Sequence, residues 1–277
     1  MEDCIASIYR DTALPKKAVL LTFDDGYIDH FSTVFPILKE RKIQGCFFPS
    51  VRAIKHNEVL DVNKIHFILA AAGKLSSLLD DVYSCLDEYR SEYDLKSNEY
   101  YYSKFAKKSR FDSRAVIFIK HLLQKELKAD LRKVIINRLF AKYVSKDEAD
   151  FSKGLYMNLE QLRHIIGNGM YVGGHGYDHC WFNALAPELQ EKEVDLSIDF
   201  LKELGSPIDN WVMSYPYGAY NDSLISILKK KDCKLGLTSR VGVAKFTKEN
   251  MFKLERLDTN DLPKERNTRL KNIMKGS

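Results

Sequence analysis

Short apolar runs that end in polar, glycine-rich turns recur near the start of the chain and in its second half. Residues 18–21 have the length and composition of a buried strand, and four more runs share this character: residues 44–49, 170–172, 211–214 and 234–238. Apolar residues at helical spacing follow the first run (Phe31, Phe35 and Leu38), and we expect Pro36 to kink that helix. A strand, a helix and a second strand at this spacing form a βαβ unit. The pattern therefore predicts a parallel α/β fold and favours a (β/α) barrel.

Local signals mark the ends of several helices in the second half of the chain. Asn158 with Gln161 forms a capping-box pattern, and Asn221 is the expected cap of a later helix. Pro187 is a favoured first-turn residue, and Gly205 is expected to end the helix that this proline begins. These boundaries place one helix before each predicted strand in this part of the chain.

The middle of the chain differs in character. From about residue 60 to 150 there is no convincing strand and almost no glycine or proline, and residues 113–143 carry helical periodicity. A loop of this length would be exceptional. We therefore predict a mostly helical insertion at residues 60–150 within a single catalytic domain that spans residues 1–277. Residues 1–17 are expected to be a polar lead-in.

Composition and charge exclude some classes of function. Of the 277 residues, 45% are apolar and 29% are charged, as in an ordinary globular protein, and the formal net charge is +5. Basic residues gather at Lys229–Lys231 and after residue 263. We expect solvated surface there, and attraction to an anionic substrate or membrane surface is the alternative. No basic stripe is interleaved with aromatic residues, which argues against a nucleic-acid partner.

Cysteine spacing and hydropathy bear on the compartment. The five cysteines are scattered without C-x-x-C spacing, which argues against a disulfide framework or a cysteine zinc site. Neither a signal peptide nor an 18-residue apolar run is visible. We therefore expect a cytoplasmic protein without a transmembrane segment, with peripheral membrane contact left open.

Three polar clusters stand where predicted strands end, which is the reactive end of a (β/α) barrel. They are the adjacent carboxylates Asp24 and Asp25, the pair His175 and His179, and residues 215–218 (Tyr-Pro-Tyr-Gly). Two histidines and one carboxylate suffice for a zinc shell with room for a water, whose pKa the metal lowers to about 7. The second carboxylate can then act as a general base. A plain Asp-Gly turn and a core role for the histidines are the alternatives that the residues alone leave open.

Taken together and in this order, the clusters resemble the motifs of the polysaccharide deacetylase family (carbohydrate esterase family 4, the NodB-homology domain). Residues 22–26 (Thr-Phe-Asp-Asp-Gly) match its first motif, residues 175–179 its second, and residues 214–218 its third. The resemblance covers roughly residues 17–50 and 155–260 and leaves the predicted insertion outside.

The resemblance implies a fold, a metal and residue roles. The fold is a distorted (β/α) barrel of about seven strands. Asp25, His175 and His179 would hold a divalent metal, with zinc expected first and cobalt, nickel or iron as alternatives. Asp24 would be the general base, and the backbone N–H of Tyr217 would help to hold the oxyanion.

The sequence departs from the family pattern at three places. Gly176 stands where the second motif has a hydroxyl residue. Ser214 stands where the third motif has the arginine that orients the base, and Arg240 or Arg256 can replace that arginine from another strand. The late Leu-x-His motif that supplies the general acid is not visible, so His66 in the insertion is our candidate acid.

The expected substrate is an N-acylated amino sugar. We expect contacts with it from Tyr215, Pro216, Trp181 and Arg240, and Trp211 is a second tryptophan able to line an acyl pocket. The resemblance implies a metal-dependent hydrolase that removes an N-acyl group, first of all N-acetyl, in surface polysaccharide or glycoconjugate biosynthesis. The sugar would be nucleotide-linked, lipid-linked or part of an oligosaccharide. Deformylation of a formamido sugar, cyclic-amide hydrolysis and a carbohydrate-binding relative without activity are the alternatives.

Overall fold

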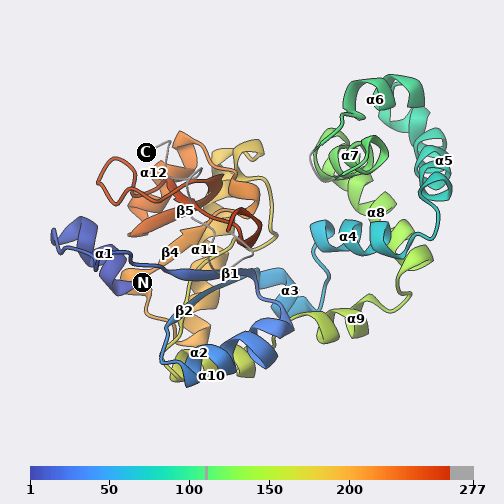
Figure 1. Ribbon diagram of the computed structural model, residues 1–277. Coiled ribbons are helices and arrows are strands. Elements are labelled where there is room, and N and C mark those ends of the chain that lie inside the picture. The colour runs from blue at the N-terminus through green and yellow to red at the C-terminus, as the bar shows by residue number, and fades with distance from the viewer. Residues whose placement is uncertain (110–111, 263–277) are drawn as a thin grey trace. The chain divides into compact units, whose positions relative to one another are not determined.

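The computed structural model describes residues 1–109 and 112–262 (Figure 1). The chain divides into two compact units: residues 1–56 with residues 153–277 form the first, and residues 57–152 form the second. The first unit holds all the described strands and the three polar clusters, whereas the second is built from helices.

Six parallel strands form the centre of the first unit. The described residues arrange them in two three-stranded sheets, in the orders β1-β2-β3 and β4-β5-β6. One parallel bridge joins the sheets: the Gly174 amide donates to the Val212 carbonyl, and the Ser214 amide donates to the Gly174 carbonyl, each at 2.9 Å. β3 and β4 are therefore neighbours, and the strands follow chain order across one array. The strands are β1 (Leu21–Asp25), β2 (Gly45–Pro49), β3 (Tyr171–Val172), β4 (Val212–Ser214), β5 (Leu235–Val241) and β6 (Leu254–Arg256).

Side chains link the two edges of this array. Arg256 on β6 donates from Nη1 to Thr22 Oγ1 at 3.2 Å and to Asp24 Oδ1 at 3.0 Å on β1. Within residues 1–109 and 112–262 no backbone ladder joins β6 to β1. The predicted α/β class is thus confirmed, but the predicted barrel of about seven strands is not, because the described residues form six strands whose edges meet through side chains.

Apart from α1, which precedes β1, the helices of the first unit lie between the strands in the chain, and they pack around the array (Figure 1). α11 contacts α3, α10 and α12, so these helices form a continuous layer. The helices are α1 (Glu2–Tyr9), α2 (Phe35–Glu40), α3 (Val51–His56), α10 (Leu159–Gly167), α11 (Pro187–Leu204) and α12 (Asp222–Lys230). Single turns occupy His30–Val34, Phe182–Ala184, Ile208–Asn210, Pro216–Gly218 and Thr259–Asp261.

The predicted helix boundaries in the second half of the chain are confirmed by their caps. Asn158 Oδ1 accepts from the Gln161 amide and Gln161 Oε1 accepts from the Asn158 amide, each at 2.9 Å, which completes a capping box. Pro187 is the first residue of α11, and Gly205 follows its last residue with a left-handed φ of 74°. The Asn221 side chain accepts a bond of 3.0 Å from the first turn of α12.

The helix expected around Pro36 is interrupted before the proline. A π-helical turn spans His30–Val34, and α2 begins at Phe35. Pro36 lies in the first turn of α2, where its missing N–H costs no intrahelical hydrogen bond. Val34 and Phe35 both keep helical backbone angles, so the segment changes from π-helical to α-helical geometry just before Pro36 instead of breaking there.

The expected polar lead-in is wrong, because residues 2–9 form the helix α1. Met1, Cys4, Ile5 and Ile8 are buried. They pack against a cluster of inward-facing side chains from β2 to β6: Cys46, Phe48, Tyr171, Val212, Leu235, Leu237 and Leu254. The Tyr9 hydroxyl reaches the Lys234 carbonyl just before β5 at 3.3 Å, so α1 covers the end of the array at which the strands begin.

The first strand begins later than residues 18–21 predict. Val19 is 82% exposed and Leu21 is 37% exposed, and β1 includes the carboxylates themselves. β1 is an edge strand, so its first residues pair on one side only. Phe23 stacks on Phe47 at 5.0 Å on one face of β1, which leaves its neighbour Asp24 on the other face.

The second unit is helical, as the sequence predicts for the middle of the chain. Its helices are α4 (Asp61–Ala71), α5 (Leu75–Tyr93), α6 (Asn98–Phe105), α7 (Arg114–His121), α8 (Ala129–Tyr143) and most of α9 (Glu148–Leu155), with a π-helical turn at Leu122–Glu126. The Lys64 side chain is 3% exposed and pairs with Glu148 at 2.7 Å, and its ammonium donates to Asn137 at 2.6 Å. This buried cation ties α4, α8 and α9 together. That the chain is one catalytic domain with an insertion stays a prediction.

No helix in the described part of the chain is both long and apolar enough to cross a membrane.

We predict that truncating the core face of α1 destabilises the protein. Ile8 is 3% exposed, so Ile8→Ala should lower the free energy of unfolding by about 2–5 kcal/mol. Val19→Ala is the control, because Val19 is 82% exposed and its truncation should cost less than about 0.5 kcal/mol. Urea unfolding followed by circular dichroism measures both. Equal effects of the two substitutions would contradict the position of α1 in the core.

Candidate active site

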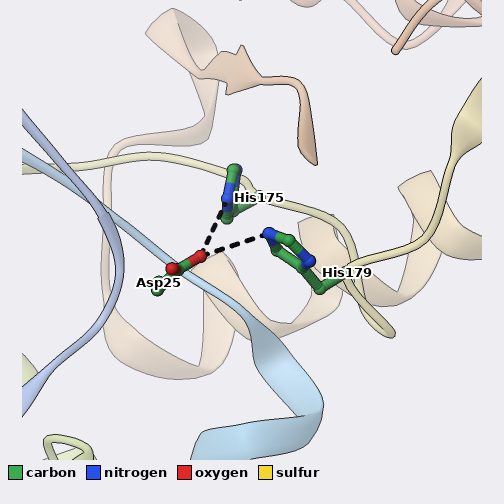
Figure 2. A group of neighbouring side chains, drawn as sticks. All are labelled: Asp25, His175 and His179. Atoms are coloured by element: carbon green, nitrogen blue, oxygen red, sulfur yellow. Dashed lines mark ion pairs between the residues drawn. The ribbon is translucent and has the colours of Figure 1, made fainter. Parts of the chain in front are cut away.

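Asp25, His175 and His179 converge where β1 and β3 end (Figure 2). The Nε2 atoms of His175 and His179 lie 3.3 Å and 3.2 Å from Asp25 Oδ1. One potential ligand atom from each side chain lies within 4.8 Å of the other two. Residues about 150 positions apart in the chain thus meet because parallel strands bring their C-terminal ends to one edge of the array.

Hydrogen bonds fix how the two imidazoles present their nitrogens. His175 Nδ1 lies 2.8 Å from the Ser214 carbonyl, which can only accept, so Nδ1 carries a proton and Nε2 is the nitrogen that faces Asp25. His179 Nδ1 is buried and has no hydrogen-bond partner among the described residues. A neutral imidazole that presents Nε2 beside a carboxylate, with Nδ1 held by a backbone carbonyl, is the usual state of a metal-ligating histidine.

The donor set fits a divalent metal ion. Two imidazole nitrogens and one carboxylate oxygen are the ligands of catalytic zinc, which leave a fourth position open. Ligands at about 2.0–2.1 Å from a tetrahedral ion stand about 3.3 Å apart. The Nε2–Oδ1 separations of 3.3 Å and 3.2 Å match that spacing.

Three residues of the site have a left-handed backbone conformation. Asp25, His179 and Tyr217 adopt left-handed φ values of 70°, 50° and 57°. Such conformations cost a non-glycine residue about 1–3 kcal/mol and persist where surrounding contacts hold them. Gly26 follows Asp25 with φ 80°, and a Cβ there would lie 2.8 Å from the Pro49 Cβ, so the turn after the carboxylates requires glycine.

Asp24 has its own partners, separate from the histidines. Arg256 binds it with two bonds, from Nη1 to Oδ1 at 3.0 Å and from Nη2 to Oδ2 at 2.6 Å. The Ser214 hydroxyl donates to the same carboxylate at 3.1 Å. Arg256 Nε also donates to the Thr238 carbonyl at 2.8 Å, which holds the guanidinium in place. Of the two arginines expected to replace the one missing at Ser214, the structure thus brings Arg256 to Asp24.

Charges of both signs set the protonation of the carboxylates. Burial raises the pKa of Asp24, but His175 and Arg256 outweigh it and leave that pKa below its ordinary value. Burial also raises the pKa of Asp25, while bonds to His175 and His179 pull that pKa well below its ordinary value. Burial lowers the pKa of His175, whereas Asp24 and Asp25 raise it, and the result is a raised pKa. Both carboxylates are therefore ionised near neutral pH.

The residues of the third cluster, 215–218, lie partly in the core and partly beside the site. Tyr215 is buried and its hydroxyl donates to the Phe252 carbonyl at 3.1 Å, so we leave it out of the proposed substrate contacts. Pro216 is buried and opens the turn at residues 216–218. The Tyr217 ring stacks on Trp181 with centroids 4.3 Å apart and meets the His179 ring edge-on at 4.7 Å. Tyr217 and Trp181 therefore form an aromatic wall beside His179.

Three other residues named from the sequence lie elsewhere. Trp211 is buried and its Nε1 donates to the Lys231 carbonyl at 2.8 Å, so it belongs to the core. The Arg240 side chain is 79% exposed and pairs with Glu255 at 2.8 Å. His66 is exposed on α4 of the helical unit, whereas Asp24, Asp25 and the paired histidines all belong to the other unit.

From the sequence alone, Arg256 is one of two options and nothing points to Glu193, which binds the loop between the histidines. One signal favours Arg256: it lies two positions after Leu254, so on a strand it shares the inward face with that core residue.

The fold and the site define an α/β protein with a candidate metal centre where its parallel strands end. The sequence profile of the polysaccharide deacetylase family matches residues 11–89 and 137–236, which is more than half of the chain. The protein belongs to this family of hydrolases that act on amide bonds. The match extends further into the helical unit than the resemblance indicated, leaves out residues 90–136, and ends before Arg256.

Individual relatives are distant. The protein YxkH of Bacillus subtilis, named for the same family, is 26% identical over 102 residues, which are 37% of this chain and 36% of YxkH. The chain thus spans little more than a third of that relative. The structure is similar to the deacetylase PplD of Streptococcus pyogenes, solved in complex with acetate, with a TM-score of 0.51 and 18% identity over 92% of this chain and 70% of PplD. IcaB from Ammonifex degensii matches with a TM-score of 0.44 and 19% identity over 86% of this chain and 66% of IcaB. The likeness to PplD shows the fold alone.

We predict that the protein binds one divalent ion through the Asp-His-His group. Removal of a ligand in Asp25→Ala or His179→Ala should weaken Zn²⁺ or Co²⁺ binding by more than the roughly 10–100-fold that loss of an outer-shell partner costs. His164→Ala removes an exposed histidine of the same unit and should leave affinity unchanged. Competition with a chromogenic chelator measures the affinity. Unchanged binding in Asp25→Ala would contradict the site.

Proposed function

We propose that this protein is a metal-dependent hydrolase that removes an N-acyl group, first of all N-acetyl, from an amino sugar in surface polysaccharide or glycoconjugate biosynthesis. One observation carries the proposal. Two adjacent carboxylates have separate partners: Asp25 faces the paired histidines, and Asp24 faces Arg256 and Ser214. Family membership supplies the reaction class, an amide hydrolysis. The sugar would be nucleotide-linked, lipid-linked or part of an oligosaccharide.

Amide hydrolysis needs an activated water, a polarised carbonyl and a proton for the leaving nitrogen. Asp25, His175 and His179 would hold the divalent ion, for which zinc is favoured and cobalt, nickel and iron are compatible. The bound ion supplies a Lewis acid for the carbonyl and an acidified water at neutral pH.

Asp24 is the proposed general base. Its lowered pKa keeps it ionised near neutral pH, and Arg256 and Ser214 hold its orientation with three hydrogen bonds, which leave one of the roughly four lone-pair sites of the carboxylate free. Asp24 takes the proton that the attacking water loses. A carboxyl whose pKa is low gives up that proton readily, so Asp24 is also suited to pass it to the leaving nitrogen as the C–N bond breaks. The products are a carboxylate and a free amino sugar.

The remaining assignments concern the oxyanion and the substrate. The backbone N–H of Tyr217, in a turn with φ 57°, is the proposed oxyanion donor beside His179. The wall of Tyr217 and Trp181, with Pro216 behind it, would contact the acyl group or the sugar ring. The exposed Arg240 would meet an anionic part of a linked substrate, and His66 stays a proposed second proton donor.

We predict that Asp24→Asn lowers kcat by about 10²–10⁴-fold, the usual contribution of general acid–base catalysis. Acetate and formate release from a panel of N-acyl amino sugars, with and without a chelator, measures the activity and separates deacetylation from deformylation. Asp29→Asn is the control, because Asp29 is an exposed carboxylate shortly after β1. Full occupancy by metal without release from any sugar would overturn the hydrolase proposal in favour of a carbohydrate-binding protein.

We also predict that Arg256→Ala shifts the acid limb of the kcat/KM–pH profile to higher pH. Arg256 lowers the pKa of Asp24, so its removal raises that pKa and the base is protonated at a higher pH than in the wild type. Arg163→Ala, which removes an exposed arginine on α10, should leave the profile in place. An acid limb that stays at the same pH in Arg256→Ala would show that Asp24 is not the group whose protonation limits activity.

A further inference from the structure

The loop between the two histidines lacks the hydroxyl side chain that the family motif has. Gly176 occupies that position with φ 74°, a backbone conformation that strains any other residue. A Cβ there would also lie 3.3 Å from the Phe182 ring. Yet the loop ends on His179, a ligand candidate held at φ 50°. Contacts from outside the loop must therefore hold this strained backbone.

Glu193 on α11 supplies one side of that support. Its Oε2 accepts from the Tyr177 amide at 2.9 Å and from the Asp178 amide at 3.0 Å. Hydrogen bonds from N–H groups to a carboxylate oxygen are charge-assisted, and they are about twice as strong as hydrogen bonds between neutral groups. They fix the peptide units that join residue 176 to Tyr177 and Tyr177 to Asp178, which lie just upstream of His179.

The first turn of α3 supplies the other side. The Arg52 amide donates to the Tyr177 carbonyl at 3.0 Å, and the Ser50 hydroxyl donates to the same carbonyl at 3.1 Å. The Arg52 guanidinium also pairs with the Asp178 side chain at 2.8 Å. α3 therefore binds the carbonyl side of the loop while Glu193 binds its N–H side.

We propose that Glu193 is a positioning residue of the metal centre, which fixes residues 177–178 so that His179 presents Nε2 beside Asp25. It takes the place of the hydroxyl that Gly176 lacks. The proposal rests on the proposed function in one respect: it assumes that the Asp-His-His group holds a metal. Among the described residues no hydrogen bond or ion pair joins Glu193 to a metal ligand side chain, so it acts through the loop, whose backbone it binds at Tyr177 and Asp178 and whose Cys180 side chain it also meets.

Three variants test this role in the full-length chain. Glu193→Ala removes the acceptor and should weaken Co²⁺ binding by about 10–100-fold, the cost of losing an outer-shell partner, and change the visible Co²⁺ spectrum. Glu193→Gln keeps an oxygen at the same reach and should restore binding to within a few-fold of the wild type. Glu191→Ala is the matched control on the same helix, because the Glu191 side chain is 50% exposed and, within residues 1–109 and 112–262, forms an ion pair with Lys231 alone, at 3.2 Å.

A second readout needs no metal. Hydrogen–deuterium exchange of the peptide that contains residues 175–180 should speed up in Glu193→Ala and stay unchanged in Glu191→Ala, because the protecting acceptor of two amides is lost in the first only. Circular dichroism verifies folding. If Glu193→Ala does not fold, Glu193→Asp replaces it, since it keeps the charge but shortens the reach by one methylene.

The outcomes separate this proposal from the proposed function. Unchanged Co²⁺ affinity together with unchanged exchange in a folded Glu193→Ala protein would overturn the role of Glu193, even if the wild type deacetylates sugars. Weakened binding and faster exchange would support it, even if no sugar releases acetate. A wild type that binds no Co²⁺ would refute the metal centre and with it the positioning of a ligand.

Discussion

Two neighbouring carboxylates at the end of β1 repel each other, and the site depends on how the fold compensates for that repulsion. Asp25 receives two imidazoles from the loop after β3. Asp24 accepts two hydrogen bonds from the guanidinium of Arg256 on β6 and one from the hydroxyl of Ser214 on β4. Because the partners differ, two chemically identical groups become unlike: one is suited to bind a cation and the other to accept a proton.

The same contacts serve the architecture. Arg256 joins β6 to Thr22 and Asp24 on β1, and these are the two edges of the six-stranded array. A single guanidinium therefore connects the edge strands and orients the proposed base. On the opposite end, α1 packs under the inward-facing side chains of β2 to β6, so the strands are closed by apolar packing where they begin and by polar contacts where they end.

Side chains from other elements lie where two of the three motif departures remove a polar group. Ser214 cannot supply the guanidinium that the third motif has, and Arg256 supplies it from another strand. Gly176 cannot supply a hydroxyl, and Glu193 binds the loop from α11. In each case the tertiary structure places a charged group beside the position of the missing side chain, and a motif read along the chain does not reveal this contact.

The sequence by itself determined the parallel α/β class, the helix caps at Asn158, Pro187 and Asn221, the helical middle of the chain and the motifs that meet at the strand ends. These follow from signals within a few residues, such as apolar period and capping side chains. Only the tertiary structure decided that α1 is buried, that the strands number six among the described residues, and that Arg256 and not Arg240 reaches Asp24. The reason is physical: Asp24 and Arg256 are more than 200 residues apart, and whether they touch depends on the order and register of six strands, which no local pattern encodes.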